Sequence, residues 1–358
     1  MSKKYCFTGE TKQLNSAVLH RIQALRDFSN VKKGDLGGWI EKEDNLSHDG
    51  TAWVSGTACV SDDAWVRGNA WVSDNAWVSG NSWVSGNACV RDDACVSDDA
   101  RVSGNAWVRD DARVSGNACV SGNACVRGNA WVNGNACVSD DAWVSGNACV
   151  SDNARVSDDA CVRGNARVSD NACVSGNACV SDDACVSDDA CVSGNACVSD
   201  DARVIDDAWV SDDAWVNGNA CVSGDAWVSG NARVSGDARV SDDACVSDDA
   251  CVSGNARVSG NAWVRGNSVV TCGIIIGNVS LAYKDIFQYQ CEKRVLTAIL
   301  TEDDEVLYSI GCQKNITKEV FIDRIHNEEG GIEKNPHRKE YLRLIKCVEV
   351  YFGKEKNR

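Results

Sequence analysis

Residues 52–69 read AWVSGTACVSDDAWVRGN, and their six-residue pattern continues far along the chain. Every sixth residue from Val54 to Val270 is valine, and the residue two places before it is alanine except at Ser82 and Ser268. Residues two apart in an extended strand point to the same side, so alanine and valine face one way and the residue between them faces the other. The polar pair that follows, most often Gly-Asn or Asp-Asp, suits a turn. Each hexad therefore predicts a short strand and a corner.

A strand of about three residues cannot bury its apolar face alone, so equivalent hexads are expected to stack in parallel around a continuous Ala/Val core. This predicts an all-β parallel solenoid over residues 36–276. In the extended frame, Ile40 and Leu46 take alanine positions, while Ile274 and Ile276 take alanine and valine positions. Low-complexity disorder is the alternative for a chain rich in Gly, Ser, Asp and Asn. Unbroken valine periodicity argues against it, because disorder has no reason to keep an apolar residue in frame.

The unit A-x-V-x-[GD]-[ND] resembles the hexapeptide repeat of left-handed β-helices. That resemblance implies a left-handed path with three hexads in each coil. The segment GDLGGWIEKEDNLSHDGTAWV, residues 34–54, also resembles uncharacterised bacterial and prophage hexapeptide-repeat proteins. In these proteins the segment opens the solenoid and a small C-terminal domain follows, and they are often labelled acyltransferases.

The two ends of the chain depart from the repeat. Residues 1–35 are expected to form a lead-in that covers the first coil, because a solenoid end exposes strand edges. Their apolar spacing allows a helix (Leu14, Val18, Ile22 and Leu25 on one face) or a strand around residues 22–24. Residues 277–358 predict a small α+β domain. It has strands at 294–300 and 305–310 joined by a turn, a helix over 317–326, and a second helix that begins at Pro336.

Charge and composition restrict the classes of function. Residues 51–270 contain 31 Asp and 14 Arg, with no Glu or Lys, a net charge of −17 that repels nucleic-acid phosphates. The same acidity permits a phage-type inhibitor that imitates DNA and occupies a host DNA-binding or defence protein. No apolar run is long enough to predict a membrane span, and the start of the chain lacks an apolar leader, so we expect a cytoplasmic protein with reduced thiols.

The outward position takes Trp, Cys or Arg in every regular hexad except that of Val269. A position that alternates among these three is not expected to be a specific catalytic or ligand-binding position. Steps of three hexads divide the outward residues into three faces. Face 1 begins at residue 53, face 2 at residue 59 and face 3 at residue 65. Exposed tryptophan marks interfaces, so faces 1 and 3 predict homo-oligomer contacts through Trp53 and Trp71, and through Trp65, Trp83, Trp209 and Trp227. Face 2 carries most of the outward arginines.

Chemical sites receive weaker support. The resemblance to hexapeptide acyltransferases implies a histidine as the general base. The weak candidate here is His48, which falls at a valine position where packing is the simpler role. Stacked aspartates are weak candidates for a hard cation: Asp92, Asp93, Asp110, Asp111, Asp182, Asp183, Asp200 and Asp201. Cys161, Cys179 and Cys197 share one column and Cys173 and Cys191 another. Neighbours about 4.8 Å apart fall within the Cα range for disulfides and could share a soft metal, but exposed thiols are the simpler interpretation, and no C-x2-C spacing indicates zinc. No cofactor fingerprint is present.

The leading interpretation is a non-enzymatic structural or interaction protein, an acidic β-helix that mediates protein binding or assembly. The DNA-mimicking inhibitor and the hexapeptide acyltransferase are the alternatives. The identity of a protein partner does not follow from the residues.

Overall fold

A computed structural model of the chain describes residues 3–14, 16–271, 273–276, 280–281, 286–291, 294–301, 304–310, 313–327 and 338–354. The chain forms two compact units, Met1–Gly194 and Asn195–Arg358, and each is described by itself. The hexad frame of the sequence runs through both units.

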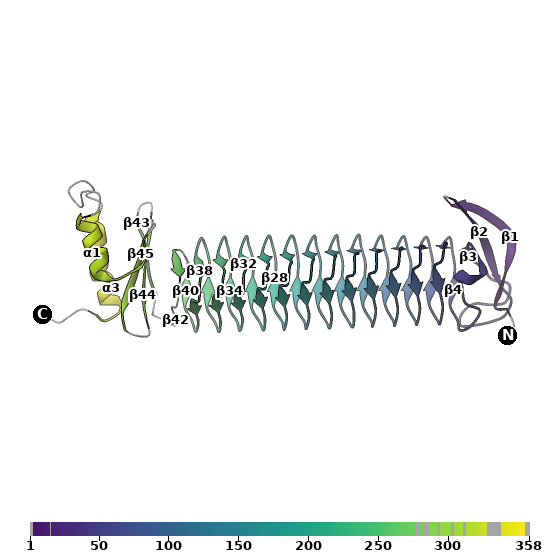
Figure 1. Ribbon diagram of the computed structural model, residues 1–358. Helices are drawn as coiled ribbons and strands as arrows, with labels where there is room; N and C mark the ends of the chain where they lie inside the picture. The colour runs from purple at the N-terminus through teal and green to yellow at the C-terminus, as the bar shows by residue number, and fades with distance from the viewer. Residues whose placement is uncertain are drawn as a thin grey trace. The chain divides into compact units, whose positions relative to one another are not determined.

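The first unit begins with strands, which decides between the helix and the strand expected for the lead-in. β1 (Tyr5–Leu14) pairs antiparallel with β2 (Ala17–Ala24), and β2 pairs antiparallel with β3 (Leu36–Ile40). β3 then pairs in parallel with β5 (Cys59–Val60), so the antiparallel lead-in joins the parallel coils through one shared strand (Figure 1).

The coils consist of two-residue strands at six-residue intervals. In the first unit they run from β4 (Trp53–Val54) through β5, β6 (Trp65–Val66) and β7 (Trp71–Val72) to β27 (Cys191–Val192). In the second they run from β28 (Cys197–Val198) to β40 (Val269–Val270), with β38 extended to Arg257–Ser259, followed by β41 (Ile274–Ile276) and β42 (Ser280–Leu281). Within each unit the regular strands pair in parallel with the third strand after them, as Trp53 with Trp71 and Trp65 with Trp83. The predicted parallel solenoid with three hexads per coil is confirmed.

Alanine and valine form the core of each coil, as predicted. Their side chains in the regular hexads are buried, for example Ala100 and Val102 at 0% exposure. The backbone ladder crosses between coils: the N–H of Trp83 donates to the carbonyl of Ala100, and that of Ser85 to the carbonyl of Val102, both at 2.9 Å. Burial of each valine contributes about 1.5–3 kcal/mol before entropy is counted. Stability therefore grows with the number of stacked coils.

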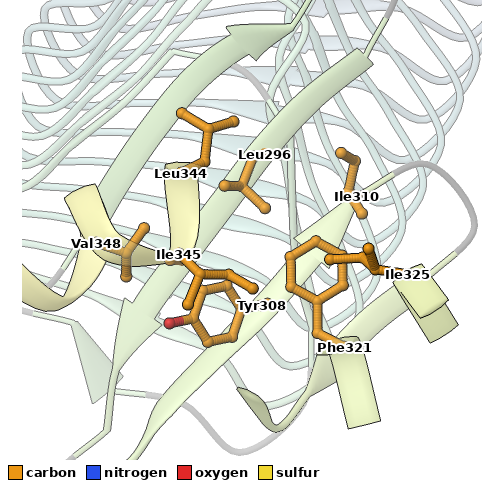
Figure 2. Packing of buried hydrophobic residues seen from close by; sticks show 9 residues of the cluster. Leu296, Tyr308, Ile310, Phe321, Ile325, Leu344, Ile345 and Val348 are labelled. Atoms are coloured by element: carbon orange, nitrogen blue, oxygen red, sulfur yellow. The ribbon is translucent and has the colours of Figure 1, made fainter. Parts of the chain in front are cut away.

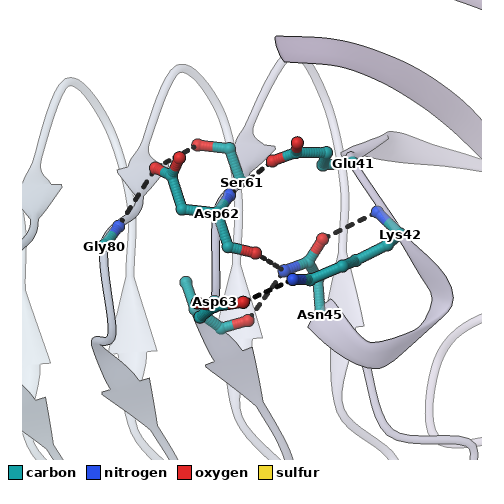
Figure 3. Close-up of polar contacts among 8 residues, drawn as sticks. Glu41, Lys42, Asn45, Ser61, Asp62, Asp63 and Gly80 are labelled. Carbon is teal, nitrogen blue, oxygen red and sulfur yellow. Dashed lines mark hydrogen bonds and ion pairs between the residues drawn. The ribbon is translucent and has the colours of Figure 1, made fainter.

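Each corner turns through a residue of positive φ, which is why its first polar position is Gly or Asp. Gly104 has φ +69° and Asp98 has φ +60°. Aspartate tolerates this region better than most residues, and here its carboxylate also accepts a backbone N–H from the next coil. The Gly116 N–H lies 3.1 Å from Asp98 Oδ2, and Figure 3 shows the equivalent bond from Gly80 to Asp62.

The second corner position forms asparagine ladders along the coils. Asn87 Nδ2 donates to Asn105 Oδ1 at 2.9 Å, and Asn105 donates to Asn123 at 2.8 Å. Asn123 then donates to Asp141 at 2.8 Å. An ionised carboxylate accepts but has no N–H to pass on, so an aspartate ends a ladder.

The ends of the repeat differ in register from the sequence prediction. Ile40 pairs with Val60 and Leu46 with Val66, so both residues take valine positions and not the predicted alanine positions. The step from Leu46 to Val66 exceeds three hexads, because two extra residues lie in the corner before Gly50. At the other end Ile275 pairs with Val258, a step one residue short of three hexads. Ile275 is thus the buried valine equivalent, and the assignment to Ile274 and Ile276 was wrong by one residue.

The C-terminal part of the second unit is a four-stranded antiparallel sheet with two helices. β43 (Ile286–Cys291), β44 (Arg294–Leu300), β45 (Val306–Ile310) and β46 (Gln313–Ile316) pair in that order. The predicted β44–β45 hairpin is confirmed, whereas β43 and β46 were not expected. Helices α1 (Lys318–Asn327) and α3 (Arg338–Tyr351) follow; the predicted start at Pro336 lies outside the described residues. Neither helix is long and apolar enough to cross a membrane.

The core of this small domain joins the sheet to both helices. Leu296, Tyr308 and Ile310 from the sheet pack against Phe321 and Ile325 of α1. Leu344, Ile345 and Val348 of α3 complete the same cluster (Figure 2). The domain thus has a hydrophobic core of its own, independent of the Ala/Val core of the coils.

The corner geometry predicts how Gly104 responds to substitution. A Cβ there would lie 2.7 Å from the carbonyl oxygen of Gly122, at a φ that costs L-residues about 1–2 kcal/mol. We expect Gly104→Ala to lower the denaturation midpoint measured by circular dichroism. Gly104→Asp should lower it less, because its carboxylate can accept the Gly122 N–H as Asp98 accepts that of Gly116. Ser103→Ala is the control, and an Asp variant less stable than the Ala variant would contradict this account of the corner.

Candidate functional site

Two exposed tryptophans form a stacked pair on face 3 of the first unit. Trp65 on β6 and Trp83 on β9 (Trp83–Val84) occupy in-register outward positions, and their ring centroids lie 5.5 Å apart with planes at 28°. They stay 42% and 37% exposed. The Arg67 guanidinium lies over both rings, 4.2 Å from the centroid of Trp83 and 5.8 Å from that of Trp65. These cation–π contacts restrict the motion of the two exposed indole rings.

The tryptophan pair borders a shallow depression of about 360 Å³ whose rim is charged. Its other lining residues are Lys42, Asp44, Asp63 and Asn81. Lys42 Nζ forms an ion pair with Asp63 Oδ1 at 2.5 Å, visible in Figure 3. An aromatic surface beside paired charges is suited to a protein side chain with an apolar body and a polar end.

The second unit repeats this arrangement on its own face 3. Trp209 on β30 (Trp209–Val210) and Trp227 on β33 (Trp227–Val228) stack with centroids 5.4 Å apart and planes at 10°. They are 45% and 48% exposed, and the Trp227 Nε1–H donates to Ser211 Oγ at 3.3 Å. Four of the six tryptophans predicted as interface residues therefore lie at the surface as two stacked pairs.

The two remaining predicted interface residues on face 1 are covered more fully. Trp53 is only 2% exposed, which corrects its prediction as a contact residue. Phe28 of the lead-in packs edge-on against its ring at 5.3 Å, and Gly37 of β3 leaves room for the same ring. Trp71 is half-buried. The lead-in thus covers face 1 at the first coil, which outward alternation alone did not reveal.

His48 does not occupy a valine position, which corrects the sequence prediction. It lies with Asp49 in the two-residue insertion of the first coil, where its ring stacks on Tyr5 at 4.4 Å. Nδ1 accepts the Lys4 backbone N–H at 3.2 Å, and Nε2 lies 3.9 Å from Glu43 Oε2. Burial lowers the pKa of His48, with the opposing effect of Glu43 the next largest. These contacts give the imidazole a role in packing the lead-in.

The polar cap of the first coil was missed by sequence reasoning. The buried Lys4 ammonium donates to the carbonyl of Ala52 at 2.7 Å. The Tyr5 hydroxyl lies within 2.9 Å of the carbonyls of Glu43 and Leu46. Asn45, in the 3-10 turn η1 (Glu43–Asn45), donates through Nδ2 to the carbonyls of Asp62 and Ala64 (Figure 3). These side chains satisfy carbonyls at the start of the coils.

Six of the eight aspartates proposed as cation ligands, all except Asp111 and Asp201, accept hydrogen bonds. Asp92 Oδ2 lies 3.4 Å from the Asp110 N–H, and Asp110 Oδ2 accepts the Gly128 N–H at 3.0 Å. Asn165 donates to Asp183 at 2.8 Å, and the Gly218 N–H donates to Asp200 at 3.1 Å. Ser181 donates to Asp182, Asn75 donates to Asp93, and Asp201 lines a surface depression. Within the described ranges no three His, Cys, Asp or Glu side chains converge as metal ligands.

Comparison with known proteins identifies the type of repeat. Residues 226–242, 232–248 and 250–266 match the family model described as the YdcK beta solenoid repeat. The chain is similar to the solved UDP-N-acetylglucosamine acyltransferase of Francisella novicida, with 10% identity over 74% of this chain and 88% of that chain and a TM-score of 0.23. It is also similar to a "putative acetyltransferase" from Desulfovibrio desulfuricans G20, with 11% identity over 58% of this chain and 68% of that chain and a TM-score of 0.17.

No curated protein matches the chain. The coils make this a β-solenoid repeat protein, and the matched segments are similar to one known β-solenoid repeat. The two solved structures assign no activity to it.

The cap predicts an unusual titration of Lys4. Burial, followed by repulsion from Arg26, lowers the pKa of its ammonium to about 8. The unfolded chain binds more protons than the folded one between that value and about 10.4, so the free energy of unfolding rises with pH across this interval. We expect the Lys4 side-chain ¹³C resonance to titrate near pH 8. A Lys4 midpoint at the ordinary lysine value of about 10.4 would contradict a buried amine at this position.

Proposed function

We propose that this β-solenoid repeat protein is a non-enzymatic assembly protein that binds a second copy of the chain through exposed tryptophans. The observation that carries the proposal is the stacked pair Trp65–Trp83, which recurs as Trp209–Trp227. Large apolar side chains gathered at a surface are costly in water and usually mark an interface. Tryptophan also dominates the binding energy of many protein interfaces.

The coil surface suits an isologous contact, in which the same patch of each copy faces the other. On face 3 each tryptophan pair projects from in-register strands, so its rings are held before contact is made and lose little freedom on binding. Arg67 and the Lys42–Asp63 ion pair border the first pair and supply a polar rim. The partner is therefore expected to offer an apolar surface with charges of both signs.

The net charge of −17 over residues 51–270 opposes this association. Two acidic surfaces repel, and the repulsion is screened as the Debye length falls from about 10 Å at 0.1 M salt to about 3 Å at 1 M. Self-association through tryptophans should thus strengthen with salt, whereas binding to a cationic protein would weaken. This opposite dependence separates assembly from the DNA-mimic alternative.

The contacts of His48 give no support to an acyltransferase. A general base must reach the proton of its substrate, but the His48 ring is stacked on Tyr5 and its Nδ1 already accepts the Lys4 N–H. We therefore place His48 in the structure of the cap. The variant His48→Ala should loosen the lead-in.

The assembly proposal predicts the mass of the full chain in solution. Light scattering in reducing buffer at tens of micromolar should give a mass above the 38.3 kDa of one chain, and the mass should rise with salt. The double variant Trp65→Ser/Trp83→Ser should lower it by removing one of the two tryptophan pairs. Trp131→Ser is the matched control, because Trp131 is 45% exposed but stands alone on face 2 between Arg113 and Cys149.

Two results would overturn the proposal. One is a monomer at every salt concentration, and the other is equal loss of mass in the double variant and the Trp131→Ser control. Circular dichroism of each variant shows whether its coils are retained.

A further inference from the structure

Face 3 of the first unit carries a second pattern beyond its tryptophans. From β12 (Arg101–Val102) onward, the in-register outward residues are Arg101, Cys119, Cys137, Arg155, Cys173 and Cys191. Two pairs of neighbouring cysteines thus each follow an arginine. All four thiols are half-buried. We call Cys119–Cys137 and Cys173–Cys191 the paired thiols.

Within each pair the two cysteines occupy the same outward position on adjacent coils. Arg101 adjoins Cys119 in the column, and Arg155 adjoins Cys173. Each pair therefore combines two thiols on strands about 4.8 Å apart with an arginine at the next position of the column.

We propose that each of the paired thiols is a two-coordinate binding site for one soft monovalent cation of the Cu(I) class. Thiolate sulfur is the ligand that Cu(I) prefers in proteins. Two metal–sulfur bonds, each about as long as the 2.3 Å of zinc–thiolate, span about 4.6 Å end to end, close to the strand spacing of about 4.8 Å. Equivalent side chains on stacked coils are thus held at the separation that a linear S–metal–S unit needs.

The competing chemistry is less well matched to this spacing. A disulfide needs Cβ atoms about 3.8 Å apart, so side chains held parallel on strands about 4.8 Å apart would have to tilt toward each other. Zinc takes four ligands, and no set of three metal-binding side chains converges in the described ranges. On binding, both sulfurs give up their protons to solvent and the site gains a net charge of −1. Arg101 and Arg155 lie at adjacent positions of the column to offset that charge.

Single cysteines on face 2 provide matched controls. Cys95 lies between Trp77 and Arg113, and Cys149 lies between Trp131 and Arg167. These thiols share the strand position, the half-burial and the arginine neighbour, but they have no cysteine on the adjacent coil. A further pair on face 1, Cys161–Cys179, stays unchanged in every variant.

The test is anaerobic titration of the reduced full chain with Cu(I) in the presence of a competing chelator. Metal ions retained per chain are counted by native mass spectrometry. We expect Cys137→Ser and Cys191→Ser each to lose one retained ion, and the double variant to lose two. Cys95→Ser and Cys149→Ser should lose none. Arg101→Gln should weaken retention at Cys119–Cys137 without removing the site.

The proposal is overturned if the double variant retains as many ions as the unchanged chain, since the paired thiols then hold none. It is equally overturned if the face 2 controls lose as many as the paired variants, since binding would then follow thiol number and not spacing. Circular dichroism of each variant verifies the coils, because serine keeps nearly the size of cysteine.

Discussion

The structure depends on one constraint: within each unit, each residue of a regular coil is stacked on the residue three hexads further along the chain. Valine burial and the backbone ladder enforce it together, because a slip by one residue would turn every valine outward and place the Trp, Cys or Arg side chain in the core. Alanine two positions before valine keeps the inner side narrow enough for three strands to close one coil. The corners follow from the same requirement, since each coil must turn three times, and Gly or Asp with positive φ allows the turn.

In-register stacking also decides what the outward residues can do, because each side chain meets the one at the same position on adjacent coils. Identical residues on adjacent coils form tryptophan stacks, thiol pairs and asparagine ladders. Where a Gly lies on the coil after an Asp, its backbone N–H donates a hydrogen bond to the carboxylate. A single substitution therefore changes contacts on two coils. The outward positions vary freely for folding, yet the order of residues along a column creates local surfaces. We base both proposals, assembly and metal binding, on the order of the outward residues that are stacked three hexads apart.

The regular coils were predictable from the sequence, because strand alternation and the valine period are local properties that three-hexad stacking converts into columns. The hairpin of β44 and β45 was predictable for the same reason. The ends were not, because register there depends on tertiary contacts: two residues at His48 and Asp49 bulge out, and the last coil is one residue short. Trp53 is buried by Phe28, and Lys4 reaches Ala52 from a distant part of the sequence, and neither contact leaves a periodic signal. The Cys119–Cys137 pair was also overlooked, although its three-hexad spacing would have revealed it.

The most direct test of in-register stacking is the exciton coupling between tryptophans in circular dichroism. Trp65 and Trp83 are three hexads apart in the sequence, and their ring centroids lie 5.5 Å apart, so their indole transitions should couple. Trp131 has Arg113 and Cys149 as its column neighbours. The account predicts that Trp83→Phe removes a paired positive and negative band from the spectrum, while Trp131→Phe removes only the signal of one isolated indole. Equal difference spectra for the two variants would contradict the stacking of residues that are three hexads apart.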